Sequence, residues 1–382
     1  MTTTKNNEHK KLKAPNLRFP EFQGEWENCK LGDYGKVVTG NTPPTKDVEN
    51  YENGTFLWAS PADLGTIKSI SETKTMLSAK GFSKTRALPK GSVLVTCIGS
   101  TIGKMGMATK EMSTNQQINS IVVNDNSDNE FVYYAIQSAF PRYLSSIAVQ
   151  AVPIISKSAF ELLPNQRPCL QEQKKIGKML SLLDERIATQ NKIIDRLQSL
   201  IKGIRNDVYG KLRKSVGVNA MISDVLSYEQ PQPYIVENTE YTAEGIPVLT
   251  ANKAFVLGYT SETNGIYDKG DCIIFDDFTL DCKYVDFPFK VKSSAIKILT
   301  AKNKELLRYT FEFLKYLDLS TEEHKRHYIA ETQNQEFILP TEQMVKTIAH
   351  IFSTLSLRME TAVKQRDVFE KQKQYLLRQM FI

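Results

Sequence analysis

The chain has 382 residues, more than one hydrophobic core usually supports, so we expect two or more domains. Its 41% hydrophobic and 24% charged residues are ordinary for a globular protein, and its net charge of +6 favours a nucleic-acid partner only slightly. It contains no run of ~18 apolar residues, no apolar leader and no CxxC pair among its five cysteines, so we predict a cytoplasmic protein without membrane spans or disulfides.

The first half of the chain has the pattern of a mixed α/β unit. Short, buried strands are expected at 56–58, 92–97 and 118–123, followed by an amphipathic helix at 131–140. Polar loops such as TGNTPPTKD (39–47) are longer than a simple connection requires. Such loops are usually functional or disordered.

A sustained heptad pattern follows between Gln171 and Val208. Apolar residues recur at alternating spacings of four and three, with Gln190 in the one polar position. This 3.5-residue period keeps one seam of a helix turned toward a partner helix. The predicted seam consists of Ile176, Leu180, Leu183, Ile187, Ile194, Leu197, Ile201, Ile204 and Val208. Nothing breaks this pattern before Gly210, so we expect one long helix of about 35–40 residues.

The second half repeats this order. Short strands are expected at 247–249, 272–275 and 294–299, and a helix at 305–317. A second seam lies 172 positions after the first, and Arg366 and Lys373 occupy two of its positions. Its apolar members are Ile348, Phe352, Leu355, Met359, Phe369, Leu376 and Met380.

Matching segments of the two halves are separated by offsets of 191, 179, 176 and 172, as expected for one unit that occurs twice with shorter loops in the second copy. Each heptad helix lacks a partner in its own half, so we expect the two helices to pack on each other. The predicted fold class is mixed α/β (α+β) with an internal repeat. Its globular and helical parts alternate as 15–167, 168–213, 214–340 and 341–382.

The segment GSTIGK at 99–104 is similar to a phosphate-binding loop, but it has one residue too few between its glycines. In addition, Met105 stands where Ser or Thr should hold Mg²⁺. We therefore reject nucleotide binding. Two interpretations stay open: a plain turn between strands, or a contact of Thr101 and Lys104 with DNA phosphate.

Three acids and a lysine, Asp276, Asp277, Asp281 and Lys283, are similar to a nuclease motif. They crowd on one loop, whereas a metal site needs acids that converge from different strands. Base or phosphate contact, or loop capping, is favoured.

Other candidate chemistry finds little support. Cys169 has no glycine-rich cofactor fingerprint before it and is interpreted as structural, and no adenine-methyltransferase tetrad occurs. His324 and His327 lack metal-ligand companions, so we expect them on a solvated face.

At this point the sequence resembles the specificity subunits of type I restriction–modification enzymes, over essentially all of 15–382. The resemblance rests on an opening PNLRFPEFQGEWENCKLGDYGKVVTGNTPP, on KGSVLVTCIGSTIGKMGM and STNQQINSIVV, and on the helix boundary SAFELLPNQRPCLQEQKKIGKMLSLLDERI. In the second half it rests on KGDCIIFDDFTLDCKYVDFPFKVKSSAIKIL and LLRQMF. One departure is expected, since the second unit lacks the stretch that corresponds to Ile154, Ser156 and Lys157.

The resemblance implies a non-catalytic, DNA-binding subunit. Two target-recognition domains, related by a pseudo-twofold repeat, would each read one half of a split site on double-stranded DNA. The two long helices would pack as an antiparallel coiled coil, set the spacer and dock two methyltransferase subunits, and restriction subunits would complete the complex. The chain would carry no cofactor or metal of its own, because S-adenosylmethionine, ATP and Mg belong to the partners. No membrane is implied.

Asn and Gln side chains suit adenine, and Arg and Lys suit guanine or phosphate. The candidate DNA contacts are Lys46, Arg86, Thr101, Lys104, Asn115, Gln116, Gln117 and Lys157 in the first half, and Lys253, Asp277, Thr279, Lys283, Lys325, Arg326 and Gln333 in the second. Two alternative functions are carried along: a self-sufficient nuclease or methyltransferase, and a coiled-coil scaffold that binds DNA without reading its sequence.

Overall fold

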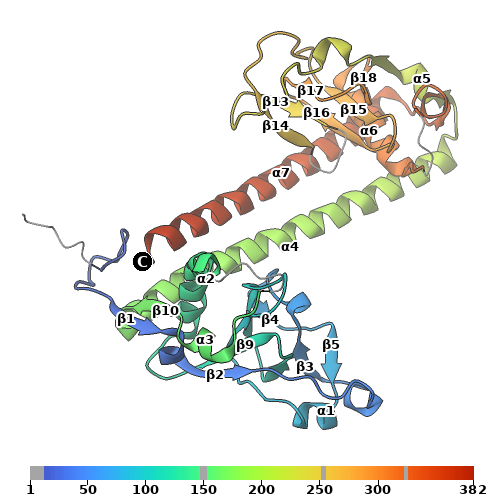
Figure 1. Cartoon of the computed structure of the whole chain (residues 1–382). Coiled ribbons are helices and arrows are strands. Elements are labelled where there is room, and N and C mark those ends of the chain that lie inside the picture. The colour runs from blue at the N-terminus through green and yellow to red at the C-terminus, as the bar shows by residue number, and fades with distance from the viewer. Residues whose placement is uncertain (1–12, 147–152, 251–254, 322–325) are drawn as a thin grey trace, which may run out of the picture. The chain divides into compact units, whose positions relative to one another are not determined.

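The computed structural model describes residues 13–146, 153–250, 255–321 and 326–382 (Figure 1). The chain divides into two compact units. Unit 1 comprises the chain up to Gln190 together with Gln365–Ile382, and unit 2 comprises Asn191–Lys364. Each unit contains a globular head and parts of two long helices, α4 (Leu170–Ser215) and α7 (Glu342–Gln379).

The head of unit 1 is built on a five-stranded sheet with the order β2-β9-β6-β7-β4, beside a three-stranded sheet β5-β3-β8 and the pair β1-β10. Its strands are β1 (Glu27–Lys30), β2 (Gly35–Thr39), β3 (Phe56–Ala59), β4 (Ser69–Ile70), β5 (Thr75–Leu77), β6 (Val93–Thr96), β7 (Met105–Ala108), β8 (Met112–Thr114), β9 (Ile118–Val123) and β10 (Pro164–Arg167). Its helices are α1 (Ala79–Ser83), α2 (Asn129–Ser146) and α3 (Lys157–Glu161), with 3₁₀ turns η1 (Leu31–Tyr34), η2 (Val48–Asn50) and η3 (Pro61–Asp63).

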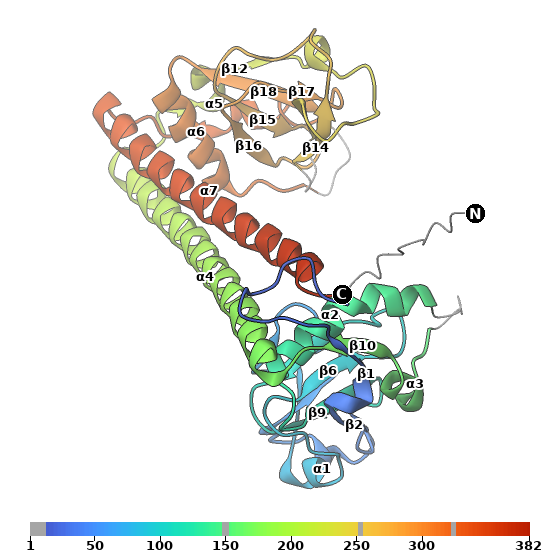
Figure 2. The same cartoon turned by 90° about the vertical axis from the view of Figure 1, so that its left-hand side faces the viewer.

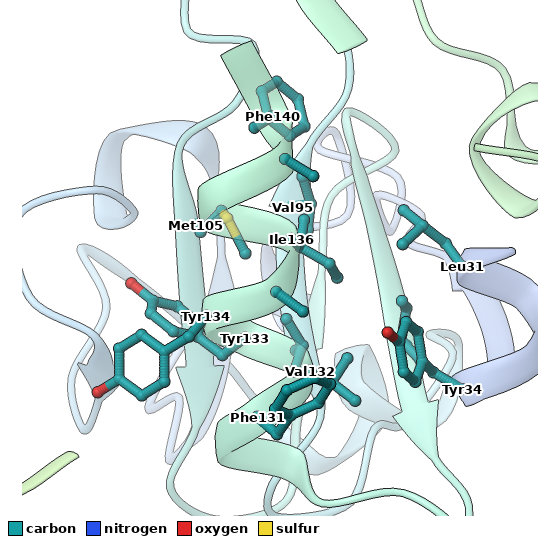
Figure 3. Packing of buried hydrophobic residues seen from close by; sticks show 14 of the residues in the cluster. Leu31, Tyr34, Val95, Met105, Phe131, Val132, Tyr133, Tyr134, Ile136 and Phe140 are labelled. Atoms are coloured by element: carbon teal, nitrogen blue, oxygen red, sulfur yellow. The ribbon is translucent and has the colours of Figure 1, made fainter. Parts of the chain in front are cut away.

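Helix α2 covers one face of the five-stranded sheet and lies beside β10 (Figure 2). Its first turn is capped by Asp128, whose carboxylate accepts the N–H of Phe131 at 2.9 Å. Apolar side chains of α2 pack on Val95 and Met105 of the sheet (Figure 3). The predicted helix at 131–140 is confirmed and is longer than expected at both ends.

The head of unit 2 is built on a four-stranded sheet with the order β12-β18-β15-β16, beside a three-stranded sheet β14-β13-β17 and the pair β11-β19. Its strands are β11 (Ala220–Met221), β12 (Leu226–Glu229), β13 (Ile246–Leu249), β14 (Val256–Thr260), β15 (Cys272–Asp276), β16 (Cys282–Val285), β17 (Lys290–Val291), β18 (Ile296–Ala301) and β19 (Glu336–Phe337). Its helices are α5 (Ile222–Val225) and α6 (Lys304–Leu317), with turns η4 (Gln232–Tyr234) and η5 (Thr332–Asn334). Helix α6 covers the four-stranded sheet.

The predicted repeat is present at the level of strand register. In unit 1 β6 pairs with β9 so that Thr96 lies opposite Ile118, and in unit 2 β15 pairs with β18 so that Phe275 lies opposite Lys297. Both members of the second pair lie 179 positions after the first. The capping residue of α6, Asn303, accepts a backbone N–H in the manner of Asp128. The strands predicted in the two halves coincide with β3, β6, β9, β13, β15 and β18.

The two long helices pack antiparallel in each unit. In unit 1 the start of α4 meets the end of α7, where Gln190 donates to Gln365 at 3.1 Å. In unit 2 the end of α4 meets the start of α7, where Ile204 and Val208 pack in one cluster with Phe352. The predicted fold class, two mixed α/β units joined by two long antiparallel helices, is confirmed.

The predicted seam residues are all buried or half-buried. Eight are buried: Ile176, Leu180, Leu183, Ile194, Ile348, Phe352, Leu355 and Met380. The others are half-buried: Ile187, Leu197, Ile201, Ile204, Val208, Met359, Phe369 and Leu376.

Helix α4 has 46 residues, more than the 35–40 expected, and it passes through Gly210. The helix continues to Ser215, because Tyr209 and Leu212 on either side of the glycine are buried in the core of unit 2. That burial outweighs the cost of about 1 kcal/mol for a glycine inside a helix. The helix ends before Gly217, whose φ of +78° suits a glycine at a helix C-terminus.

The stretch 154–157 has no sequence counterpart in unit 2, but a similar backbone contact occurs there. In unit 1 the N–H of Ile155 donates to the carbonyl of Cys97 at 2.8 Å, beyond the end of β6. In unit 2 the N–H of His327 donates to the carbonyl of Asp277 at 3.0 Å, beyond the end of β15. A segment near His327 thus takes the place of 154–157, although its sequence and spacing differ.

Candidate nucleic-acid interface

The hairpin turn between β6 and β7 contains the segment 99–104. The backbone N–H groups of Gly99, Ile102, Gly103 and Lys104 donate to carbonyls of Pro153, Gly99, Thr96 and Thr101, at 2.9–3.1 Å. These four groups are used to fold the turn, so the structure favours a plain turn over a backbone cradle for phosphate. The Lys104 side chain is exposed and Thr101 is half-buried, so a contact with DNA through these side chains stays a prediction.

Several candidate contacts meet beside the start of β9. Asn115 is buried, and its side-chain amide donates to Gln117 at 3.1 Å. Gln116 is exposed and accepts a hydrogen bond from the hydroxyl of Thr42. Arg86 is exposed and donates to the carbonyl of Thr39 at 2.7 Å, in the same loop as Thr42. Arg86 and Gln116 are therefore both bonded to the short stretch from Thr39 to Thr42, and Gln117 is bonded to the buried Asn115.

The remaining candidates of unit 1 lie apart from this group. Lys46 is exposed in the loop before η2. Lys157 begins α3 and forms an exposed ion pair with Glu161 at 3.6 Å. Its segment is bonded to the chain just after β6, because Ile155 donates to Cys97. Lys157 is thus two residues from a backbone contact with the hairpin strand.

The acidic loop of unit 2 is occupied by internal contacts. Asp276 accepts the N–H groups of Phe278 at 2.8 Å and Thr279 at 3.2 Å, which caps its own loop. Asp281 pairs with Lys283 at 3.0 Å and also with Lys315. In the described part of the chain no three His, Cys, Asp or Glu side chains are grouped to hold a metal ion. The loop therefore gives the nuclease alternative no support.

Asp277 is a framework residue. It is 1% exposed and forms an ion pair with Lys297, also 1% exposed, at 3.5 Å. Its other carboxylate oxygen accepts the N–H of Tyr328 at 2.8 Å. The prediction of a direct DNA contact does not fit this burial, because the side chain faces the protein interior.

The other candidates of unit 2 vary in exposure. Thr279 is exposed at the tip of the loop, and Lys283 is half-buried beside Asp281. Arg326 is exposed and donates to Ser294 at 3.4 Å, and Gln333 donates to the carbonyl of Ile329 at 2.8 Å. Lys253, His324 and Lys325 lie outside the described residues.

The expectation of a solvated His327 is wrong. The residue is 1% exposed, and its Nδ1 lies 2.8 Å from Glu331. Its backbone N–H bonds to Asp277, which draws it inward.

The thiols offer no activated nucleophile in the heads. Burial raises the pKa of Cys97 to about 12 and likewise the pKa of Cys272 and of Cys282 to about 12. These thiols therefore stay protonated near neutral pH. Cys169 is exposed and directly precedes α4.

Sequence reasoning missed the buried polar residues that hold these segments. Asn119 is 3% exposed, accepts from Thr39 at 2.6 Å, and donates to the carbonyl of Ile155 at 3.4 Å. Lys297 lies between Ile296 and Ile298 in a strand with an otherwise apolar face. A lysine inside a buried strand predicts a buried acidic partner, so this signal was available in the sequence.

Residues 23–199 match the family model described as "Type I restriction modification DNA specificity domain". The matched segment makes up a little less than half of the chain. Within this range lie the head of unit 1 and much of α4. Over this range the resemblance found in the sequence is confirmed.

Two relatives illustrate the family. The chain is 44% identical over 126 residues to the type I restriction enzyme EcoR124I/EcoR124II specificity subunit of Escherichia coli, and the alignment covers 31% of each protein. It is 29% identical over 182 residues to the type I restriction enzyme MjaIX specificity subunit of Methanocaldococcus jannaschii, which covers 45% of this chain and 42% of the relative. In these alignments the chain spans less than half the length of either relative.

The fold is similar over a longer range than the sequence. The S subunit of the type I restriction–modification system from M. genitalium superposes with a TM-score of 0.72 at 16% identity, and covers 97% of this chain and 99% of that chain. At this identity the likeness concerns the fold alone, and it includes unit 2, which lies mostly beyond the family match. No helix in the described ranges is both long and apolar enough to cross a membrane.

Proposed function

We propose that this chain is the DNA-reading, non-catalytic subunit of a type I restriction–modification complex and acts in the cytoplasm. The match of 23–199 to a DNA specificity domain carries the proposal. Unit 2 repeats the sheet register and helix cover of unit 1, which supports two reading heads for the two halves of one split site. The exposed polar groups of unit 1 near Arg86 and Gln116 suit base edges and phosphates.

The helices would set the spacer between the two half-sites. Helix α4 is continuous over 46 residues, roughly 70 Å at 1.5 Å per residue. A continuous helix resists bending better than a loop, so it can hold two heads at a fixed separation along DNA.

The helices would also dock the partners. Both carry exposed apolar side chains away from their seam, namely Leu182, Ile193 and Leu200 on α4 and Ile351, Leu357, Val368 and Tyr375 on α7. Exposed apolar groups along one scaffold support a protein partner. We assign this surface to two methyltransferase subunits, which would bring S-adenosylmethionine. Restriction subunits would add ATP- and Mg-dependent steps.

Methylation mapping tests the proposal. The chain is expressed together with the methyltransferase subunit encoded beside it, in a host without DNA methylation, and the genome is sequenced for modified adenine. We expect methylation at one split motif that is absent when this chain is left out. If the two subunits co-purify and DNA binding depends on salt but not on sequence, the scaffold alternative replaces the proposal. Cleavage or methylation by this chain alone would favour the enzyme alternative.

A further inference from the structure

In each head, a segment later in the chain forms a backbone hydrogen bond to a residue at the turn of a hairpin. The hairpin is β6–β7 in unit 1 and β15–β16 in unit 2. In unit 1 the segment runs from Pro153 to Lys157, and Ile155 bonds to the carbonyl of Cys97. In unit 2 the segment includes Arg326 and His327, and the N–H of His327 donates to the carbonyl of Asp277. Both segments contain an exposed cation, Lys157 or Arg326, within two residues of this bond.

In unit 1 a buried side chain strengthens the attachment. Asn119 lies on β9, in the middle of the sheet, and is 3% exposed. Its amide donates to the carbonyl of Ile155 at 3.4 Å, and its oxygen accepts from Thr39 at 2.6 Å. The backbone N–H of Ile155 therefore bonds to Cys97, and its backbone carbonyl bonds to Asn119.

In unit 2 the corresponding segment is held by the side chain of Asp277. Asp277 accepts the N–H of Tyr328 at 2.8 Å through its carboxylate, next to the backbone bond from His327. Lys297 neutralises the carboxylate at 3.5 Å and donates to Gln230 at 3.0 Å. Two consecutive N–H groups of the segment thus end on one residue.

The strand registers show that the charged pair is specific to unit 2. Lys297 on β18 lies opposite Phe275 of β15, and Ile118 on β9 lies opposite Thr96 of β6. Lys297 therefore occupies the position in unit 2 that Ile118 occupies in unit 1. A buried ion pair contributes little net stability compared with apolar residues of similar size. Its presence at this position of unit 2 is better explained by what Asp277 holds than by stability.

We infer that Asn119 and Asp277 are positioning residues for DNA reading, each in its own head. Asn119 fixes the segment that presents Lys157, and Asp277 fixes the segment that presents Arg326. Neither side chain touches DNA. The inference rests on the proposed function, and it assigns each residue to one half-site only.

Two double variants separate the effect of the hydrogen bond between Asp277 and Tyr328 from the effect of the buried ion pair with Lys297. Asp277→Asn/Lys297→Met and Asp277→Leu/Lys297→Met both remove the buried ion pair, but only the first keeps an oxygen that accepts from Tyr328. In unit 1, Asn119→Leu removes the bond to Ile155. Leu249→Ala, in the other sheet of unit 2, is the control for general destabilisation, because Leu249 is fully buried and distant in sequence from these segments.

The full complex with its methyltransferase subunit is tested on duplexes that carry the wild-type split site or one substituted base pair in either half. For Asp277→Leu/Lys297→Met, we expect discrimination against substitutions in one half-site to fall about tenfold, near the effect of one mismatched pair, with the other half unchanged. Asp277→Asn/Lys297→Met should restore it. Asn119→Leu should affect the opposite half-site, so the two variants are controls for each other.

The outcomes separate the inference from the proposed function. If wild type methylates no split site, the proposed function has failed. If wild type reads a split site but both variants weaken both halves equally, or Leu249→Ala reproduces their pattern, the two residues are merely structural and the inference is overturned. Equal loss in the two Asp277 variants would also overturn the role of the hydrogen bond.

Discussion

The two heads are joined to the same two helices by different chemistry. In unit 1 the central acid is Asp184 on α4, which pairs with Lys373 of α7 at 2.6 Å and lies 3.8 Å from Lys68 of the head. In unit 2 the central acid is Glu312 on α6 of the head, which pairs with Arg205 of α4 and with Arg308, each at 2.7 Å. We call the contact between a head and the two long helices its junction. The central acid lies on a long helix in the junction of unit 1 and on the head in the junction of unit 2.

The junction of unit 1 explains a flaw in the heptad pattern. Lys373 replaces an apolar seam residue because Asp184 and the ring of Tyr134 receive its ammonium, the latter at 5.4 Å. The hydroxyl of Tyr134 donates to Asp184. Burial, and then the adjacent carboxylate, raise the pKa of Tyr134, so it stays a protonated donor. A polar position in this seam therefore attaches a head rather than weakening the helix pair.

The junction of unit 2 combines ions with aromatic rings. Arg308 donates to the carbonyl of Phe352 at 3.3 Å and to the hydroxyl of Ser356 on α7. Its guanidinium also lies 5.0 Å from the ring of Tyr284. Since Ser356 is displaced by 172 positions from Asp184, the same helix position carries an acid in one unit and a hydroxyl in the other. Heads exchanged between junctions would leave buried charges without partners.

Lengthening the helices between the two junctions has the largest expected effect. Four residues inserted near Gln190 and four near Ala362 should lengthen the spacer by ~6 Å, close to two base pairs. Methylation of the wild-type site should then fall about 10³-fold, toward non-specific levels, while a site with the longer spacer gains it. Methylation mapping of both proteins provides the measurement. An unchanged spacer would contradict the role of the helices in setting it.

Glu312→Ala should be the most damaging single substitution at the junctions. Glu312 is 1% exposed, and its loss leaves Arg308 and Arg205 with uncompensated charge in a buried setting. We expect a loss of about 4 kcal/mol from the stability of unit 2. Both tryptophans of the chain, Trp26 and Trp58, lie in unit 1, so their fluorescence reports unit 1 while circular dichroism reports both units. Urea unfolding should shift in circular dichroism and not in fluorescence, and a shift in fluorescence alone would refute the assignment.

Asp184→Ala should shift tryptophan fluorescence as well as circular dichroism, with a smaller effect than Glu312→Ala. Its loss leaves Lys373 without its carboxylate partner, whereas Lys68 keeps its ion pair with Glu130 at 2.6 Å. The side chains of Lys68 and Lys373 are also 9% and 16% exposed, so both retain some hydration. A loss of about 3 kcal/mol is expected, visible in tryptophan fluorescence of unit 1. Asp184→Asn keeps an acceptor for Tyr134 and should recover part of it. Identical losses in the two variants would mean that the charge alone matters.

The positions of helices and strands could be predicted from the sequence, but the contacts that join each head to the long helices could not. Strands such as β6, β9, β15 and β18 were located because short apolar runs between turn residues determine them locally. The helix seam was located because its period is local too. The contacts among Lys68, Glu130 and Asp184 join residues that lie far apart in the chain, and no periodicity reports such a pairing. The length of α4 was underestimated for the same reason, since the burial of Tyr209 near its end depends on α6.

Candidate DNA contacts show the same limit. Asn115 and Asp277 were chosen by side-chain type, and both are buried and hydrogen-bonded. Residue type predicts which groups can bind a base, but exposure depends on the fold around them. Arg86 and Gln116 share a face because the loop from Thr39 to Thr42 contacts both, which no spacing in the sequence indicates.

The smallest effect is expected at Tyr209, which carries a hydroxyl that the corresponding residue of unit 1, Phe381, lacks. Tyr209 and Phe381 lie 172 positions apart, and both pack on aromatic rings of their own unit, Tyr209 on Tyr309 and Phe381 on Phe131. The hydroxyl of Tyr209 donates to the carbonyl of Tyr309 at 2.7 Å, and burial raises its pKa well above the usual value, so it stays a donor at any pH the protein tolerates. Tyr209→Phe makes unit 2 resemble unit 1 and should cost about 1 kcal/mol, measured by urea unfolding in circular dichroism. Phe381→Leu, which removes a ring but no hydrogen bond, is the matched control in unit 1 and should shift the fluorescence transition instead. A neutral Tyr209→Phe would mean that ring packing alone holds this junction, and that the hydroxyl adds nothing to the difference between the two units.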